Sequence, residues 1–225
     1  MSPSRTDAWR PVVVTLALLV AVVALRSTVV PSNLHFVLHC AVIVAVALLA
    51  RSFRVTADEL GLARGTWRSG ALVALAVFVV VGAFVAVVVW LGRDTTTLDD
   101  GRVQVGTAGM LWKALVVIPI GTVVMEELAF RGLLLALCRR ATSTRNAVVV
   151  SSASFGIWHV VTAWNTASGA ASSRVLAVVG TIVATAAAGV VLCWLRLRFR
   201  SLLPPIAAHT ALNSVAFAVA WLAAR

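Results

Sequence analysis

The sequence predicts an all-α bundle of about seven transmembrane helices with its N-terminus in the cytoplasm. Three observations lead to this fold class: 61% of the 225 residues are apolar, only 12% are charged, and the mean hydropathy is +1.00. Soluble domains carry about 25% charged residues, and less than about half of their residues are apolar. The composition therefore excludes an ordinary soluble enzyme, a disordered chain and a collagen-like fibre.

Seven segments are long and apolar enough to cross a bilayer, which takes roughly 20 residues per helix. They cover about residues 11–30, 34–50, 69–91, 109–138, 147–165, 174–195 and 202–223. The second is short, and the fourth contains charged residues. Most of the eight tryptophans lie near predicted span ends, the depth that amphipathic rings prefer.

The positive charges predict the orientation. The chain has 19 lysines and arginines against 8 aspartates and glutamates. Most of the arginines fall in alternate loops, at 51–68, 139–145 and 196–200, and at the N-terminus. Positively charged loops face the cytoplasm, so these segments are expected there, with the loop at 93–102 outside. The positive excess is thereby explained without nucleic-acid binding.

Two regions are distinguished by where the polar motifs lie. Residues 1–105 form N-terminal transmembrane helices, and residues 106–225 form the region that carries the motifs. Before the third span, Thr56 and Glu59 have the spacing of a capping box, which predicts a short helix. In the sixth span, Gly180 begins a series of small residues four apart, which predicts a close-packing face.

The fourth span contains two carboxylates and a guanidinium, Glu126, Glu127 and Arg131. An ionisable residue at mid-bilayer costs about 2.5–3.5 kcal/mol, so it needs a partner or a function. Glu127 and Arg131 are four apart and can form an ion pair on one helix face. Glu126 has no counter-ion on its own helix and is the candidate for chemistry. The alternative is a purely structural ion pair, with Glu126 bonded to a neighbouring helix.

Two further spans carry polar residues at a similar depth. His159 lies in the fifth span, and His209 and Asn213 lie four apart in the seventh. At 1.5 Å per residue, Glu126, His159 and Asn213 are roughly 17–20 Å from the cytoplasmic ends of their spans, and His209 is roughly 10 Å. Each residue alone is typical of helix packing. Together they indicate a shared polar pocket inside the membrane.

This set of residue types suits hydrolysis by water. Glu126 is a candidate general base, and a histidine can help to hold the water. His209 and Asn213 can donate hydrogen bonds to a tetrahedral oxyanion. The same pocket could bind zinc through Glu126, His159 and His209. The zinc helix His-Glu-x-x-His, an aspartyl Gly-x-Gly-Asp motif and a serine Gly-x-Ser-x-Gly motif are all absent from the sequence.

His35 and His39 form a second histidine pair, four apart at the outer end of the second span. This spacing can hold a metal, but no third ligand is evident in the sequence. The depth also differs from that of the polar pocket. An interfacial position is therefore expected for both.

The three polar motifs resemble those of a known family of membrane proteases. The matching residues are Glu126-Glu127-x-x-x-Arg131, Phe155-x-x-x-His159 and His209-x-x-x-Asn213, in this order and each in an apolar helix. They resemble the CPBP family (CAAX protease and bacteriocin-processing family, also called ABI), which includes the type II CAAX prenyl endopeptidases. The resemblance covers about residues 108–220.

The resemblance implies proteolysis inside the membrane. The catalytic positions of the family are matched by Glu126, His159, His209 and Asn213. Members are commonly labelled metalloproteases, but a glutamate-activated water without metal is the better-supported mechanism for the CAAX branch. We therefore expect that no cofactor is required, although zinc is possible.

The sequence thus predicts an intramembrane endopeptidase in a multi-pass membrane protein. Its expected partners are membrane lipid and a peptide or membrane-protein substrate; the sequence does not predict the oligomeric state. The composition, rich in alanine, valine and arginine, suggests a bacterial inner membrane. Two alternatives are a non-catalytic membrane protein that binds a partner, as in bacteriocin immunity or sensor regulation, and a small proton-coupled transporter.

Overall fold

The described part of the chain is a bundle of helices, seven of them able to cross a membrane, as the sequence predicts. The computed structural model describes residues 5–92, 103–167 and 169–225, and all regular secondary structure within these ranges is helical. Seven helical segments are long and apolar enough to cross a membrane: Asp7–Thr28, Ser32–Ser52, Ala57–Leu91, Thr107–Ala141, Thr144–Thr166, Ala171–Phe199 and Leu203–Ala223. The fold class is therefore confirmed. The predicted outer loop at 93–102 lies outside the described residues.

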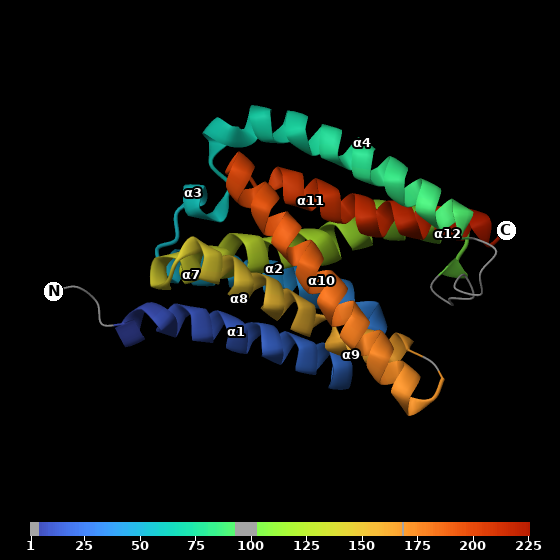
Figure 1. Cartoon of the computed structure of the whole chain (residues 1–225), viewed down its shortest axis with the longest axis horizontal. Coiled ribbons are helices and arrows are strands. Elements are labelled where there is room, and N and C mark those ends of the chain that lie inside the picture. The colour runs from blue at the N-terminus through green and yellow to red at the C-terminus, as the bar shows by residue number, and fades with distance from the viewer. Residues whose placement is uncertain (1–4, 93–102, 168) are drawn as a thin grey trace.

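The first three spans contain six helical elements. They are α1 (Arg5–Thr28), η1 (Ser32–Leu34), α2 (His35–Ser52), α3 (Ala57–Leu60), η2 (Arg64–Thr66) and α4 (Trp67–Leu91). In Figure 1, α1 begins at the same end of the bundle as α3, and the C-terminus lies at the opposite end. This placement fits an odd number of membrane crossings.

The last four spans are less regular. Their elements are α5 (Thr107–Trp112), η5 (Lys113–Val124), α6 (Met125–Glu127), η6 (Leu128–Leu134), α7 (Leu135–Ala141), α8 (Thr144–Trp158), α9 (Val160–Thr166), α10 (Ala171–Phe199), α11 (Leu203–Thr210), η7 (Ala211–Val215) and α12 (Ala216–Ala223). The segments η5, η6 and η7 are π-helical, a rare geometry that is frequent at functional sites. Pro119 lies within η5 and has no N–H to donate to a regular helical ladder. The predicted motifs thus lie on or beside irregular helix.

The fifth span is interrupted at His159, which separates α8 from α9. The His159 backbone N–H bonds to the carbonyl of Gly156, 3.1 Å away. The Phe155 carbonyl, which a regular α-helix would pair with that N–H, instead lies 2.8 Å from Nδ1 of the His159 ring. The side chain therefore ends α8 by taking over a backbone hydrogen bond. The span predicted at 147–165 is present as Thr144–Thr166, with a local irregularity at His159.

A short clasp at the arginine-rich end of the bundle joins the two halves of the chain. The predicted capping box is present, since Thr56 and Glu59 bond reciprocally at the start of α3. Glu59 also forms an ion pair of 2.6 Å with Arg140 of α7. Arg196 of α10 donates to the carbonyls of Asp58 and Glu59. These contacts hold α3 against the helices that carry the polar motifs.

Close packing between α8 and α10 depends on two glycines. A Cβ at Gly156 would lie 2.7 Å from the Ile182 carbonyl oxygen, and one at Gly189 would lie 3.1 Å from the Cα of Ser152. The predicted close-packing face is wrong at Gly180, which has no heavy atom within 4 Å of its Cβ position. The close contact with α8 lies instead on the face of α10 that carries Gly189.

The core joins helices from both ends of the sequence. Buried residues from α1 and α2 pack with η6 and α7, namely Val12, Leu19, Val22, Val42, Val46, Phe130, Leu133, Leu134 and Leu137. Phe130, Leu133 and Leu134 are completely buried. The N-terminal helices therefore form an apolar wall beside the helix that carries Glu126.

Candidate active site

Two adjacent carboxylates lie at the centre of the fourth span. Glu126 and Glu127 end α6, between two π-helical stretches, and are 3% and 0% exposed. Oε1 of Glu127 lies 2.9 Å from Nη1 of Arg131, which is also completely buried. This is the ion pair that the four-residue spacing predicts. It balances one of the two negative charges within the helix itself.

The Arg131 side chain is packed against an aromatic ring. Its guanidinium carbon lies 3.9 Å from the ring centroid of Phe155, a close cation–π contact. Nε and Nη2 of Arg131 have no hydrogen-bond partner in the described part of the chain. Glu127 and the Phe155 ring therefore provide most of the compensation for this buried charge.

His209 connects the two glutamates across the bundle. Its Nδ1 lies 2.8 Å from Oε1 of Glu127, and its Nε2 lies 3.7 Å from Oε2 of Glu126. The ring is 6% exposed and packs edge-on against Phe155, with 5.7 Å between centroids. Glu127 is paired with Arg131 as an ionised carboxylate, and the oxygens of an ionised carboxylate can only accept hydrogen bonds. Nδ1 of His209 is therefore the donor in its hydrogen bond with Glu127 and carries a proton. Helix α11 thus delivers the imidazole to both carboxylates.

Glu126 has a partner that the sequence did not indicate. The indole Nε1–H of Trp158, the last residue of α8, donates to Oε1 of Glu126 at 2.8 Å. Trp158 is 5% exposed and packs edge-on against Phe130. Oε2 of Glu126 is buried and has no hydrogen-bond partner among the described residues. One oxygen of the carboxylate is therefore held, and the other is available.

The remaining two predicted site residues are less enclosed. His159 is half-buried, its Nδ1 is hydrogen-bonded to the Phe155 carbonyl, and its ring packs edge-on against Phe155 at 4.7 Å. A carbonyl oxygen can only accept a hydrogen bond, so Nδ1 of His159 is the donor. In the neutral ring, Nε2 is then a hydrogen-bond acceptor. Asn213 is half-buried in η7 and makes no side-chain hydrogen bond within the described ranges. Both side chains have free polar groups for another molecule.

The Phe155 ring lies at the centre of this cluster, a position that the sequence analysis does not predict. Its ring contacts Arg131, His159 and His209, which come from three different helical segments. The sequence places Phe155 four residues before His159, and that spacing was the only available signal. Trp158 had no such signal, because its bond to Glu126 joins residues 32 apart in the sequence.

The comparisons with known proteins concern this same region. A sequence model of the family described as Type II CAAX prenyl endopeptidase Rce1-like matches residues 107–215. This result confirms the resemblance seen in the three motifs, all of which lie within the matched residues. No curated protein and no solved structure gave a significant match. Among its described residues the chain thus has seven helices able to cross a membrane, and residues 107–215 are similar to the Rce1-like family.

The zinc set predicted as an alternative is not gathered in the Rce1-like segment. Over the residues that the structure describes, no group of three or more His, Cys, Asp and Glu side chains is arranged to hold a metal ion. Oε1 of Glu126 is engaged by Trp158, and Nδ1 of His159 is engaged by the Phe155 carbonyl. Each of these contacts leaves a second ligating atom of the side chain free, so zinc binding by Glu126, His159 and His209 stays a prediction.

The structure turns His39 into the protein, and its expected depth at the membrane interface stays a prediction. This residue is 6% exposed, and its Nε2 is buried without a hydrogen-bond partner among the described residues. It lies within electrostatic range of Glu126 and Arg26 and packs against His35, with 6.5 Å between ring centroids. His35 is half-buried and bonds to the Val30 carbonyl. The packing of α2 against η5 turns His39 inward, toward the Rce1-like segment.

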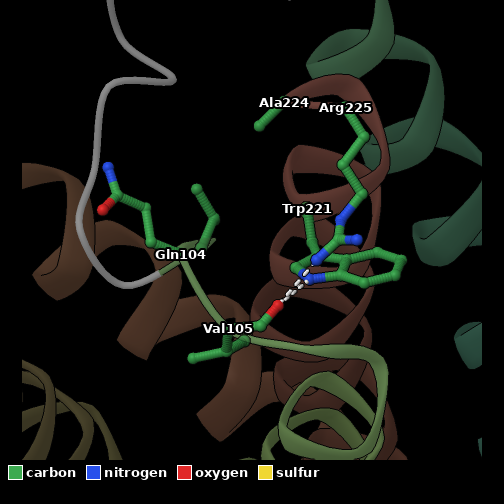
Figure 2. Close-up of a pocket in the computed structure, with 6 residues that line it drawn as sticks. Gln104, Val105, Trp221, Ala224 and Arg225 are labelled. Carbon is green, nitrogen blue, oxygen red and sulfur yellow. Dashed lines mark hydrogen bonds between the residues drawn. The ribbon is translucent and has the colours of Figure 1, made fainter.

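Two hollows lie outside the cluster of buried charges. Figure 2 shows a small pocket of about 230 Å³ where Trp221 and Arg225 both donate to the carbonyl of Val105. It contains none of the predicted site residues. A larger groove of about 520 Å³ runs between α4, α10 and α11 and is lined by apolar side chains alone. Its lining includes Ala208 and Leu212, which adjoin His209 and Asn213 in the sequence.

Proposed function

We propose that the protein is an intramembrane endopeptidase in which Glu126 activates a water molecule for attack on a peptide bond. The observation that carries this proposal is the state of the Glu126 carboxylate. Oε1 is held by Trp158, while Oε2 is buried, unpartnered among the described residues and 3.7 Å from Nε2 of His209. A buried carboxylate with one free oxygen suits a general base.

The reaction follows from the positions of these groups. Glu126 Oε2 takes a proton from water as the water oxygen attacks the carbonyl carbon of the scissile bond. The carbonyl oxygen becomes an oxyanion, to which His209 Nε2–H and the Asn213 amide donate. His159 Nε2 accepts the second hydrogen bond of the attacking water. Glu126 then transfers its proton to the leaving amine as the carbon–nitrogen bond breaks.

Donating a hydrogen bond to the oxyanion requires His209 to be doubly protonated. Its Nδ1–H already donates to Glu127, so donation from Nε2 requires a second proton on the ring. The resulting imidazolium gives a cluster of two carboxylates and two cations, with Arg131 as the other cation. Its net charge is zero, which favours burial in a low-dielectric setting.

We propose a peptide or membrane-protein substrate that approaches within the membrane. The apolar groove between α4, α10 and α11 offers a surface for an apolar segment of such a substrate, on the same span that carries His209 and Asn213. By family analogy, a prenylated CAAX peptide is the first probe to try. No metal is required in this proposal, and the arginine-rich loops and the N-terminus face the cytoplasm of a bacterial inner membrane.

The test compares wild type with Glu126→Gln, which keeps the shape and removes the base. Proteoliposomes are assayed with a farnesylated CAAX peptide, and the peptides released from bacterial membranes are compared by proteomics. Glu126→Gln is expected to lower cleavage by about 10²–10⁴-fold. Glu59→Gln is the matched control, since it makes the same change in the exposed clasp. Wild-type cleavage by Glu126→Gln refutes the proposal and favours a binding protein that tolerates the change.

A further inference from the structure

Trp158 is held rigidly beside the candidate base. It ends α8, is 5% exposed and packs against the completely buried Phe130 ring, with 5.7 Å between centroids. Gly156, two residues earlier, brings α8 into close contact with α10. The indole therefore has little freedom to turn its N–H away from Glu126.

The indole N–H does two things to the carboxylate. An indole only donates, so its bond to Oε1 stabilises the ionised form of Glu126. The bond also decides which oxygen is free, because Oε2 is the one without a partner in the described part of the protein. A carboxylate held at one oxygen cannot rotate to exchange the two.

We propose that Trp158 is a positioning residue, which fixes Glu126 through Oε1 so that Oε2 alone faces the attacking water. This inference rests on the proposed function, since it assigns the orientation of the same base. It differs from a purely structural role, in which the indole fills space and the direction of its N–H is irrelevant to the pH at which the enzyme works.

The first experiment tests the hydrogen bond in the full-length protein. The protein is labelled with ¹⁵N at the indole nitrogens in detergent micelles, and the Trp158 N–H resonance is assigned by its loss in Trp158→Phe. Glu126→Gln replaces the charged acceptor with a weaker neutral one, so this resonance should move upfield. Trp194, which is 57% exposed on α10, is the matched control and should not move. An unmoved Trp158 resonance overturns the proposal.

The second experiment tests the consequence for catalysis. The pH profile of kcat/KM is measured for wild type, Trp158→Phe and Trp194→Phe, with the farnesylated CAAX peptide or with a membrane peptide released by wild type. Losing a donor to a charged group makes ionisation of Glu126 harder. The acidic limb of Trp158→Phe should therefore move to higher pH, with about tenfold less activity below the limb. Activity above the limb should fall by less, because a carboxylate that is no longer held can turn Oε2 away from the water. Trp194→Phe should follow wild type.

The outcomes separate this inference from the proposed function. An unshifted profile, or an equal loss at every pH, overturns the role of Trp158 while Glu126→Gln remains inactive. Full activity of Glu126→Gln overturns both proposals. If Trp158→Phe does not fold, benzothienylalanine at position 158 keeps the shape of indole but has no N–H, and the same shift is expected from it.

Discussion

Removing Glu127 should unfold the protein far more readily than removing Glu126. Oε1 of Glu127 accepts hydrogen bonds from Arg131 at 2.9 Å and from His209 at 2.8 Å. Glu127→Ala would strand both donors, and two guanidinium nitrogens of Arg131 already have no partner among the described residues. Breaking a buried ion pair costs about 3–5 kcal/mol.

The loss of stability expected for Glu127→Ala can be compared with that expected for Glu126→Ala. Glu126→Ala leaves the Trp158 N–H unpaired, which costs about 1–3 kcal/mol, and removes the more distant of the two carboxylates near His209, 3.7 Å from its Nε2. Removal of a buried carboxylate offsets part of that cost. For a chain of this length, 1 kcal/mol corresponds to a change in melting temperature of about 2–4 °C, so Glu127→Ala should lower it by on the order of 10 °C. Glu126→Ala should lower it much less and should abolish cleavage.

The assay is thermal unfolding and cleavage in one detergent for both variants. Glu127→Ala/Arg131→Met provides the control, because replacing both members of a buried pair by apolar groups relieves the stranded charge. This double variant should be more stable than Glu127→Ala and should still be inactive. If Glu126→Ala unfolds the protein while Glu127→Ala is stable and inactive, the two roles have been assigned the wrong way round.

Three further predictions concern packing, orientation and metal. Gly156→Ala should destabilise the protein by about 1–3 kcal/mol, because the new Cβ would meet the Ile182 carbonyl. Gly180→Ala should be neutral or should stabilise the protein by about 0.5–1 kcal/mol. Thermal unfolding of both variants checks this prediction. Cysteines placed at the exposed positions Arg145 and Ala170 should react with an impermeant thiol reagent in intact cells only at the second; labelling at both or at neither contradicts the seven-span orientation. Chelators should leave cleavage unchanged, and stoichiometric zinc that is lost and restored together with activity would contradict the mechanism.

Much of the fold could be predicted because lipid imposes a simple rule on sequence. A spanning helix needs a long apolar run, so the seven spans were visible as composition alone. The capping box at Thr56 and Glu59 was equally visible, since it depends only on residues three apart. The Glu127–Arg131 contact also follows from local spacing. Features set by neighbours along the chain were therefore accessible.

Features that depend on contacts between helices could not be predicted from the sequence. The break at His159 arises from a side chain that competes for its own backbone, and nothing in the apolar run signals it. Which face of α10 packs against α8 depends on the rotation of both helices, so the sequence does not reveal the close approach at Gly189. Glu126 has no partner on its own helix, as expected, but the sequence could not show that Trp158 from α8 would supply one.

The apolar wall formed by α1 and α2 bears on how this protein could be shortened or recombined. The segment that matches the family begins at residue 107, yet Val42 and Val46 of α2 pack in the same core as Phe130, and His39 lies within electrostatic range of Glu126. A truncation to the matched segment would open this flank to lipid. A chimera that borrows the N-terminal helices of another family member would have to match their side-chain volumes against η6. The boundary of sequence similarity is therefore not a boundary of the working enzyme.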